Sequence, residues 1–322
     1  MLILKGDDDL AIGLACELLK NGEVVAFPTE TVYGLGADAL NPYAVAKIFE
    51  IKKRPHFDPI IVHVADLDWV KRIVRDFPEE VRRITNRFWP GPLTVILEKN
   101  EKVPDIVTAG LPTVGIRMPS HPVARRLIDS FGRPIAAPSA NPFGYISPTR
   151  ASHVARLLKE KISLVIDGGE PSFGIESTVI SVRDGKIYIY RFGALTLEEL
   201  SEFGEIIVVS GESKSHLSPG QLPYHYAPNR PLKIVESIKE IENPSSSFLA
   251  FMEPKDQVNA KYVRVLTKTG DLREAASNFF SFLIELDRED VEIIYAEKVP
   301  EKGLGRAIME RLKKAERKTF RT

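Results

Sequence analysis

Short apolar runs bounded by proline or polar residues recur through the first two thirds of the chain. Residues 24–27, 60–64 and 135–137 are clear examples, and the pattern is typical of buried strands that end in loops. Between them, residues 46–51 have a helical pattern that Pro55 ends. The pattern predicts that several strands deliver polar loops to one shared pocket.

From residue 231 onward, apolar runs alternate with helical patterns at about 272–286 and 306–317. Strands that alternate with helices indicate a small parallel sheet. The preceding stretch, residues 210–215, is polar, as expected of a linker. A chain of 322 residues is long enough for about two domains.

Two strands carry a polar residue that their apolar neighbours do not explain. His63 interrupts the apolar run 60–64, and Arg117 ends the run 114–118. A histidine in an apolar strand is more often a satisfied core residue than a ligand contact. A buried, unpaired arginine would cost several kcal/mol, so Arg117 requires a carboxylate from the protein or from a ligand.

A run of three cations, Lys52, Lys53 and Arg54, follows the first helical pattern directly. These side chains could satisfy the last helical carbonyls or bind an anion, and this segment supports both interpretations about equally. Further along, Ser139 and Asn141 bring a hydroxyl and an amide to the end of a strand.

Other polar groups follow later strands. Ser147 is expected to be the N-cap, and Pro148 the first residue, of a helix over 151–158. Such a helix N-terminus is as consistent with simple capping as with phosphate binding. Ser177 enters a strand from a glycine-containing loop, and Arg191 ends another strand, where a surface salt bridge is the alternative.

No standard nucleotide or hydrolase motif explains these groups. The chain has no P-loop, and residues 34–36 lack the third glycine of a dinucleotide fingerprint. It has no His-Glu-x-x-His motif and no paired cysteines, so we expect no metal held by the protein itself.

Charge and cysteine content narrow the class of protein further. The chain has 44 basic and 44 acidic residues, so no general attraction to RNA or anionic membranes is expected. Cys16, the single cysteine, lies in an apolar helical stretch and is expected to be a core thiol in a reducing cytoplasm. Acidic residues 7–9 precede the first apolar run, which argues against a signal peptide and suits a helix N-terminus. No apolar run is long enough to span a membrane.

Taken in order, residues 28–36 (PTETVYGLG), 52–55 (KKRP) and 137–141 (APSAN) resemble the motifs of the YrdC-like threonylcarbamoyl-AMP synthase family. Residues 218–228 (SPGQLPYHYAP) resemble the linker of its long two-domain form. The resemblance implies an α/β fold: a YrdC-like twisted open sheet with flanking helices, joined by a linker to a smaller Rossmann-like α/β domain.

We accordingly place the catalytic domain at residues 1–200, the linker at 201–230 and the small C-terminal domain at 231–322. In the family the linker folds back over the active site, which makes His225 and Tyr226 candidates for a lid over bound nucleotide. A rigid tether, stiffened by three prolines, is the alternative.

The resemblance also implies roles for individual residues. It implies catalytic roles for Lys52 and Arg54. The implied ATP site consists of Lys52, Arg54, Asp58, Thr113, Ser139, Asn141, Ser147, Arg191, His225 and Tyr226. The implied L-threonine site consists of Thr31, Tyr33, His63, Arg117, Ala137 and Ser177.

The implied reaction joins L-threonine, bicarbonate or CO2 and ATP into L-threonylcarbamoyladenylate, with release of pyrophosphate. Mg2+ would be held mainly by the ATP phosphates, because the motifs contain few acids. The product would pass to a tRNA threonylcarbamoyl transferase. The sequence decides neither direct tRNA binding nor the role of the C-terminal domain.

Three departures from the family pattern stand out. Phe192 occupies a position that is often proline, Asp58 one that is often asparagine, and residues 222–224 lack the cations of some family linkers. We therefore expect the backbone that aims Arg191 to differ from the family pattern and the linker to contribute less charge.

Two other functions compete with this one. A module that binds double-stranded RNA or tRNA would place Lys52, Lys53 and Arg54 on phosphates, but zero net charge and the lack of an aromatic stacking series argue against it. A carbamoyl-transfer protein of hydrogenase maturation needs zinc-finger cysteines, which Cys16 alone cannot supply.

Overall fold

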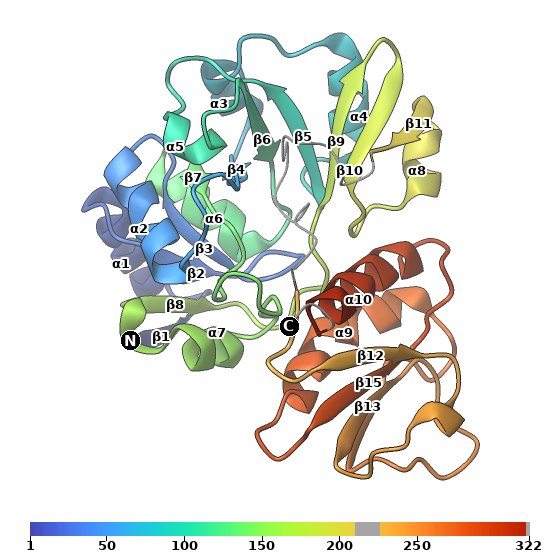
Figure 1. The fold of residues 1–322 in the computed structure, drawn as a ribbon. Helices are drawn as coiled ribbons and strands as arrows, with labels where there is room; N and C mark the ends of the chain where they lie inside the picture. The colour runs from blue at the N-terminus through green and yellow to red at the C-terminus, as the bar shows by residue number, and fades with distance from the viewer. Residues whose placement is uncertain (210–225, 320–322) are drawn as a thin grey trace.

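The computed structural model describes residues 1–209 and 226–319, which form two α/β units (Figure 1). Within the described residues, the larger unit has an eleven-stranded sheet and the smaller unit a four-stranded sheet. The predicted architecture, an open sheet with flanking helices followed by a smaller α/β domain, is confirmed.

The large sheet mixes parallel and antiparallel neighbours. Its strands in spatial order are β1 (Leu2–Lys5), β8 (Leu164–Asp167), β2 (Val25–Phe27), β3 (Gly34–Asp38), β7 (Ile135–Ala136), β4 (Val62–His63), β6 (Thr113–Arg117), β5 (Leu93–Glu98), β9 (Thr178–Arg183), β10 (Lys186–Arg191) and β11 (Glu205–Val208). Strands β4 and β6 are parallel, which sets His63 beside Arg117. Strand β11 pairs with β10, so the sheet continues into the first residues of the segment predicted as a linker.

Helices cover both faces of this sheet. They are α1 (Asp9–Lys20), α2 (Pro42–Lys52), α3 (Leu67–Ile73), α4 (Glu79–Phe88), α5 (Asp105–Thr108), α6 (Pro122–Phe131), α7 (Ala151–Leu158), the 3-10 turn η1 (Lys159–Lys161) and α8 (Leu197–Ser201). Alternate residues of β2 enter different cores: Ala26 packs in the cluster that contains α2, whereas Val25 and Phe27 pack against α1 and α6. This alternation is expected of a strand buried on both faces.

The small sheet is entirely parallel, as its alternating pattern predicted. Its strands in spatial order are β12 (Leu232–Val235), β15 (Ile293–Glu297), β13 (Ser246–Ala250) and β14 (Tyr262–Val265). Its helices are η2 (Ile238–Glu240), α9 (Leu272–Leu286) and α10 (Gly305–Thr319). Helices α9 and α10 lie between the small sheet and the larger unit (Figure 1).

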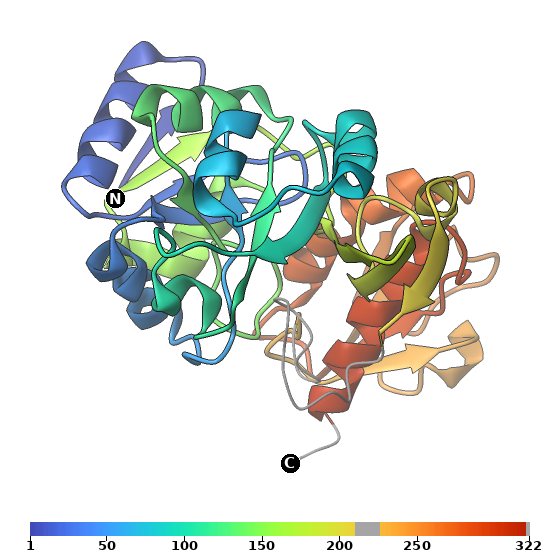
Figure 2. The same cartoon turned by 90° about the horizontal axis from the view of Figure 1, so that it is seen from above.

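One apolar cluster continues from the larger unit into the smaller one. It contains Val32 and Ile175 from the first and Phe279, Phe280 and Leu312 from the second. In Figure 2 the N-terminal helix α1, drawn in blue, lies on the side of the larger unit that faces away from this boundary. The two units therefore share a core and are not merely tethered.

Two local expectations were wrong. Helix α7 begins at Ala151 with Arg150 at the N-cap position and no side-chain cap, so Ser147 does not cap it and Pro148 is not its first residue. The Ser147 hydroxyl instead donates to Glu176 Oε1 at 2.6 Å.

In residues 1–209 and 226–319, no helix has both the length and the apolarity to cross a bilayer.

Candidate active site

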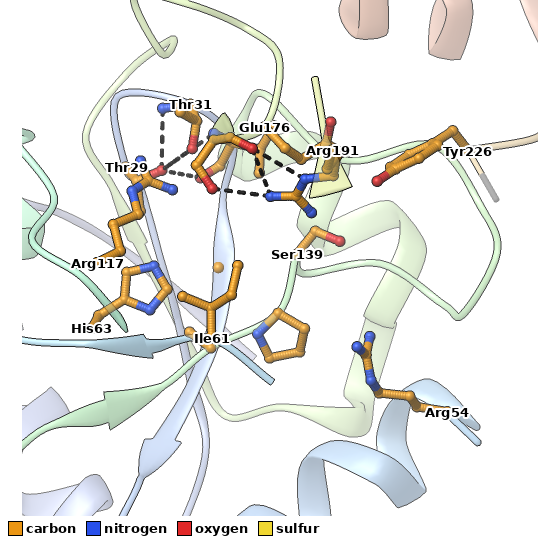
Figure 3. Close-up of a pocket in the computed structure, with 15 residues that line it drawn as sticks. Thr29, Thr31, Arg54, Ile61, His63, Arg117, Ser139, Glu176, Arg191 and Tyr226 are labelled. Carbon is orange, nitrogen blue, oxygen red and sulfur yellow. Dashed lines mark hydrogen bonds between the residues drawn. The ribbon is translucent and has the colours of Figure 1, made fainter. Parts of the chain in front are cut away.

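A cavity lies beside the short strands β4 and β7, walled by the loops that follow β2 and β7 and the loop that precedes β9 (Figure 3). The space between its walls, counted out to the open mouth, is about 550 Å³. The lining residues are Thr29, Thr31, Val32, Gly34, Arg54, Ile61, His63, Arg117, Ala137, Pro138, Ser139, Glu176, Ser177, Arg191 and Tyr226.

The cavity is rich in buried positive charge. Arg54, Arg117 and Arg191 line it and are at most 6% exposed, whereas Glu176 is the one carboxylate among the described lining residues. Guanidinium groups that are removed from water bind carboxylates and phosphates strongly, because the low dielectric strengthens charge-assisted hydrogen bonds. The cavity is therefore suited to anionic ligands.

Arg117 has the carboxylate partner that its burial requires. Its Nη2 lies 2.6 Å from Glu30 Oε1, and Glu30 Oε2 accepts hydrogen bonds from the backbone of Ser120 and His121. The Nε atom of Arg117 is buried and has no hydrogen-bond partner among the described residues. Glu30 thus holds the guanidinium, while the Nε–H of Arg117 keeps an unused hydrogen-bonding capacity.

His63 lies next to Arg117 at the same end of the cavity (Figure 3). Burial, and then the positive charge of Arg117, lowers the pKa of His63 to about 3. The imidazole is therefore neutral near pH 7 and can form hydrogen bonds without adding charge.

Ser177 and Arg191 form one hydrogen-bonded group in the cavity wall. Arg191 Nη2 donates to the backbone oxygen of Ser177 at 2.9 Å and to its hydroxyl at 3.0 Å. The Ser177 hydroxyl also lies 2.8 Å from Thr94 Oγ1. These bonds fix the direction of both side chains.

The loop after α2 carries Arg54 at the other end of the cavity, near Tyr226 (Figure 3). Its Nη2 forms a buried ion pair with Asp58 Oδ2 at 2.9 Å and donates to the Pro59 carbonyl at 2.7 Å. Asp58 therefore orients Arg54.

Lys52 is buried behind the cavity wall. Its Nζ donates to the carbonyl oxygens of Ser139 at 2.7 Å and Asn141 at 2.5 Å, and burial places its pKa well below the ordinary value. Neither Lys52 nor Arg54 caps its own helix, because both side chains bond to carbonyls outside α2. The capping interpretation is therefore wrong for these two residues.

The structure brings most, but not all, of the predicted site residues to the cavity. Those that line it are Thr31, Arg54, His63, Arg117, Ala137, Ser139, Ser177, Arg191 and Tyr226. Those placed outside its lining are Tyr33, Lys52, Asp58, Thr113, Asn141 and Ser147. Tyr33, for example, directs its hydroxyl to the Gly169 carbonyl at 2.8 Å. His225 lies outside the described residues, and the ligand roles of all these residues stay predictions.

Glu176 is a lining residue that the sequence analysis missed. Its carboxylate accepts hydrogen bonds from Ser147 at 2.6 Å and from Arg311 of the C-terminal domain at 3.1 Å. The available signal was its place directly before Ser177, in the loop that leads into the strand. Glu30 was missed in the same way, although it lies inside the motif 28–36.

Comparison with known proteins identifies the family. A family model named for Sua5, YciO and YrdC, and described as telomere recombination, matches residues 17–193. The chain is 43% identical to the threonylcarbamoyl-AMP synthase of Pyrococcus abyssi, over 96% of this chain and 94% of the relative. The chain belongs to the Sua5/YciO/YrdC family of threonylcarbamoyl-AMP synthases. As a member of this synthase family it is an enzyme, and the resemblance seen in its motifs is confirmed.

Other relatives support the two-domain form of the synthase family. A model described as the C-terminal domain of threonylcarbamoyl-AMP synthase matches residues 195–316, and the Bacillus subtilis synthase is 42% identical over 96% of this chain and 93% of its own. The crystal structure of P. abyssi Sua5 complexed with L-threonine is 39% identical, with a TM-score of 0.92 over 99% of this chain and 98% of that one.

Proposed function

We propose that the chain synthesises L-threonylcarbamoyladenylate from L-threonine, bicarbonate or CO2 and ATP, with release of pyrophosphate. The observation that carries the proposal is one cavity in which three buried arginines face neutral hydroxyl and imidazole groups. Further support comes from the P. abyssi relative, whose structure was solved with L-threonine.

We assign L-threonine to the end of the cavity with Arg117, His63 and Thr31. Arg117 lines the cavity and Glu30 does not use all of its donors, so the guanidinium can bind the amino-acid carboxylate. Neutral His63 can bond to the threonine hydroxyl, so that valine would leave a buried polar group unpaired. Ala137 provides a small apolar contact for the methyl group.

We assign ATP to the end with Arg54, Ser139, Arg191 and Tyr226. The two guanidinium groups would bind phosphate oxygens. Tyr226 would contact the nucleotide. Burial raises the pKa of Tyr226 to about 12, so its hydroxyl would stay protonated. Lys52 would act through the Ser139 loop that it holds.

The proposed chemistry joins two anions. The threonine amine takes up CO2 to form a carbamate, a carbamate oxygen attacks the α-phosphorus of ATP, and the bond to the leaving pyrophosphate breaks. Positioning and charge neutralisation by arginines suit such a transfer better than a general base does.

The cavity offers few protein side chains that could bind a metal, which fits a magnesium ion held mainly by the substrate. Glu176 is already engaged by Ser147 and Arg311, and no group of three His, Cys, Asp or Glu side chains in the described part of the chain is arranged to hold a metal. We therefore propose that the phosphates supply most of the Mg2+ ligands, which neutralises the charge that develops on pyrophosphate.

We also propose that the product passes to a tRNA threonylcarbamoyl transferase in the cytoplasm. The RNA-binding alternative has no comparable support. Lys52 and Arg54, which it would place on RNA phosphates, are 2% and 6% exposed and bond to backbone carbonyls.

The test supplies the purified protein with ATP, Mg2+, bicarbonate and labelled threonine and measures pyrophosphate. Release should require both threonine and bicarbonate. Arg117→Ala should raise the KM for threonine roughly 10- to 100-fold, since it removes a charge-assisted hydrogen bond, and change the KM for ATP less than about 3-fold.

Arg133→Ala is the matched control, because Arg133 pairs with Asp38 and its side chain is 56% exposed. It should change neither constant. Release without threonine dependence in folded protein would reject the proposed function, and equal effects of Arg117→Ala on both constants would reject the assignment of Arg117.

A further inference from the structure

Arg311 of α10 is a fully buried cation at the boundary between the two domains. Its exposure is 0%, and charged side chains are almost never buried so completely without a partner. Its Nε donates to Glu176 Oε2 at 3.1 Å, and its Nη1 donates to the Phe192 carbonyl at 2.6 Å. A side chain of the C-terminal domain thus ends in the wall of the catalytic cavity.

The neighbouring residue of α10 reinforces this contact. Glu310 Oε2 accepts a hydrogen bond from the Phe192 backbone N–H at 3.2 Å. Glu310 and Arg311 together therefore hold both main-chain polar groups of Phe192, which directly follows Arg191. A proline at this position would have no N–H to offer Glu310.

The same helix also holds the ring of Tyr226. Arg311 Cζ lies 5.0 Å and Lys314 Nζ 5.9 Å from its centroid, and Phe280 of α9 stacks on it at 5.9 Å. Tyr226 has a φ of 64°, a left-handed conformation that a bulky side chain adopts only when its surroundings impose it. Contacts from the C-terminal domain therefore hold the side chain of a residue in this conformation.

We propose that Arg311 is a positioning residue of the active site. By binding Glu176, the Phe192 carbonyl and the Tyr226 face at once, it fixes the part of the cavity wall that presents Arg191 and Tyr226 to ATP. Arg311 is not among the lining residues, so it acts through these groups. The inference rests on the proposed function, in which this end of the cavity binds the nucleotide.

A purely structural ion pair provides the comparison. Arg306, on the same helix, pairs with Glu198 of α8, also across the domain boundary, but it is 28% exposed and neither residue lines the cavity. Arg306→Met therefore removes an interdomain ion pair and leaves the cavity wall in place.

The experiment measures equilibrium binding of ATP with Mg2+, the KM values for ATP and threonine, and thermal unfolding. Arg311→Met should weaken ATP binding and raise the KM for ATP at least 10-fold, with the KM for threonine changed less than about 3-fold. Arg311→Lys should recover only part of the loss, because an ammonium lacks the planar fork that reaches Glu176 and Phe192 together. Arg306→Met should leave both KM values unchanged.

A double variant separates positioning from stability. Arg311→Met leaves the Glu176 carboxylate buried without its cation, so adding Glu176→Gln should recover thermal stability while ATP binding stays weak. The inference is overturned if the double variant regains wild-type ATP affinity, if both KM values rise equally, or if Arg306→Met has the same effect as Arg311→Met. If wild-type protein releases no threonine-dependent pyrophosphate, the proposed function fails, and ATP binding still tests Arg311.

Discussion

Burial sets the ionisation of the side chains in and around this cavity. It lowers the pKa of His63 to about 3 and raises that of Tyr226 to about 12, so both groups are neutral near pH 7. The three arginines that line the cavity stay charged. The cavity therefore separates groups that neutralise anions from groups that only form hydrogen bonds.

The neutral state of His63 predicts a pH dependence of stability. Its pKa is about 3 in the folded protein and about 6.5 when unfolded, so the unfolded chain binds more protons between these values. The free energy of unfolding should fall as the pH drops below about 6.5, by at most ~1.4 kcal/mol per pH unit from this group. His63→Gln should make the decline between pH 6.5 and 5 shallower in urea denaturation.

Exposed His56 supplies the control for this measurement. His56→Gln should leave the slope as in wild type. An unchanged slope in His63→Gln would show that His63 gains its proton in the folded state at an ordinary pH.

For single residues, the sequence predicted that a buried polar group requires a partner, but it did not predict which residue that partner is. The burial of Arg117 required a carboxylate, but only the structure identifies it as Glu30, 87 positions away. His63 could have been a satisfied core residue or a cavity group, because a strand pattern does not show which face of a strand opens to a ligand. Its register beside Arg117 decided this.

The last residue of helix α2, Lys52, directs its side chain away from the helix and binds a neighbouring loop. Lys52 Nζ bonds to the carbonyls of Ser139 and Asn141, which lie in the loop after β7. The helix therefore sets the position of a loop that lines the cavity.

Lys52→Met should destabilise the protein by about 1 to 3 kcal/mol, because it removes the donor of the Asn141 carbonyl and one of the two donors of the Ser139 carbonyl, which also accepts from the Asn141 N–H. Chemical denaturation measures this loss. Lys47→Met on the same helix is the control, since Lys47 pairs with Glu23 at the surface and its side chain is 39% exposed. It should cost less than about 0.5 kcal/mol. Equal losses in the two variants would contradict the anchoring role of Lys52.

Among elements, those with strong periodic patterns were predicted best. Helix α9 spans Leu272–Leu286, as its pattern indicated. The start of α7 was misplaced because Ser147 and Pro148 carry a strong local start signal. The bond from Ser147 to Glu176 outcompetes that signal, and it depends on a residue 29 positions away.

The whole molecule is joined through the apolar cluster that contains Val32, Ile175, Phe279 and Phe280. Because neither unit buries this surface alone, the two units should unfold together. The domain boundary is therefore also a source of stability.

The distribution of tryptophan provides a direct test of this coupling. Both tryptophans, Trp69 and Trp89, belong to the larger unit. Phe280→Ala in the smaller unit should cost about 3 to 5 kcal/mol, as for a buried aromatic residue, and should lower the midpoint of the tryptophan fluorescence transition. Leu10→Ala, at a side chain that is 77% exposed, should not. A fluorescence transition unaffected by Phe280→Ala would mean that the units unfold separately.

The sequence by itself determined the α/β class, the small parallel sheet and the family, because periodic patterns and short motifs are local properties of the chain. It also indicated that Arg54, Arg117 and Arg191 would meet in one pocket. Only the tertiary structure decided which motif residues line the cavity and which, like Lys52, are buried outside its lining. Contacts between distant segments set that arrangement. The contribution of Arg311 was invisible in the sequence for the same reason: its partner Glu176 lies 135 positions away in the other domain.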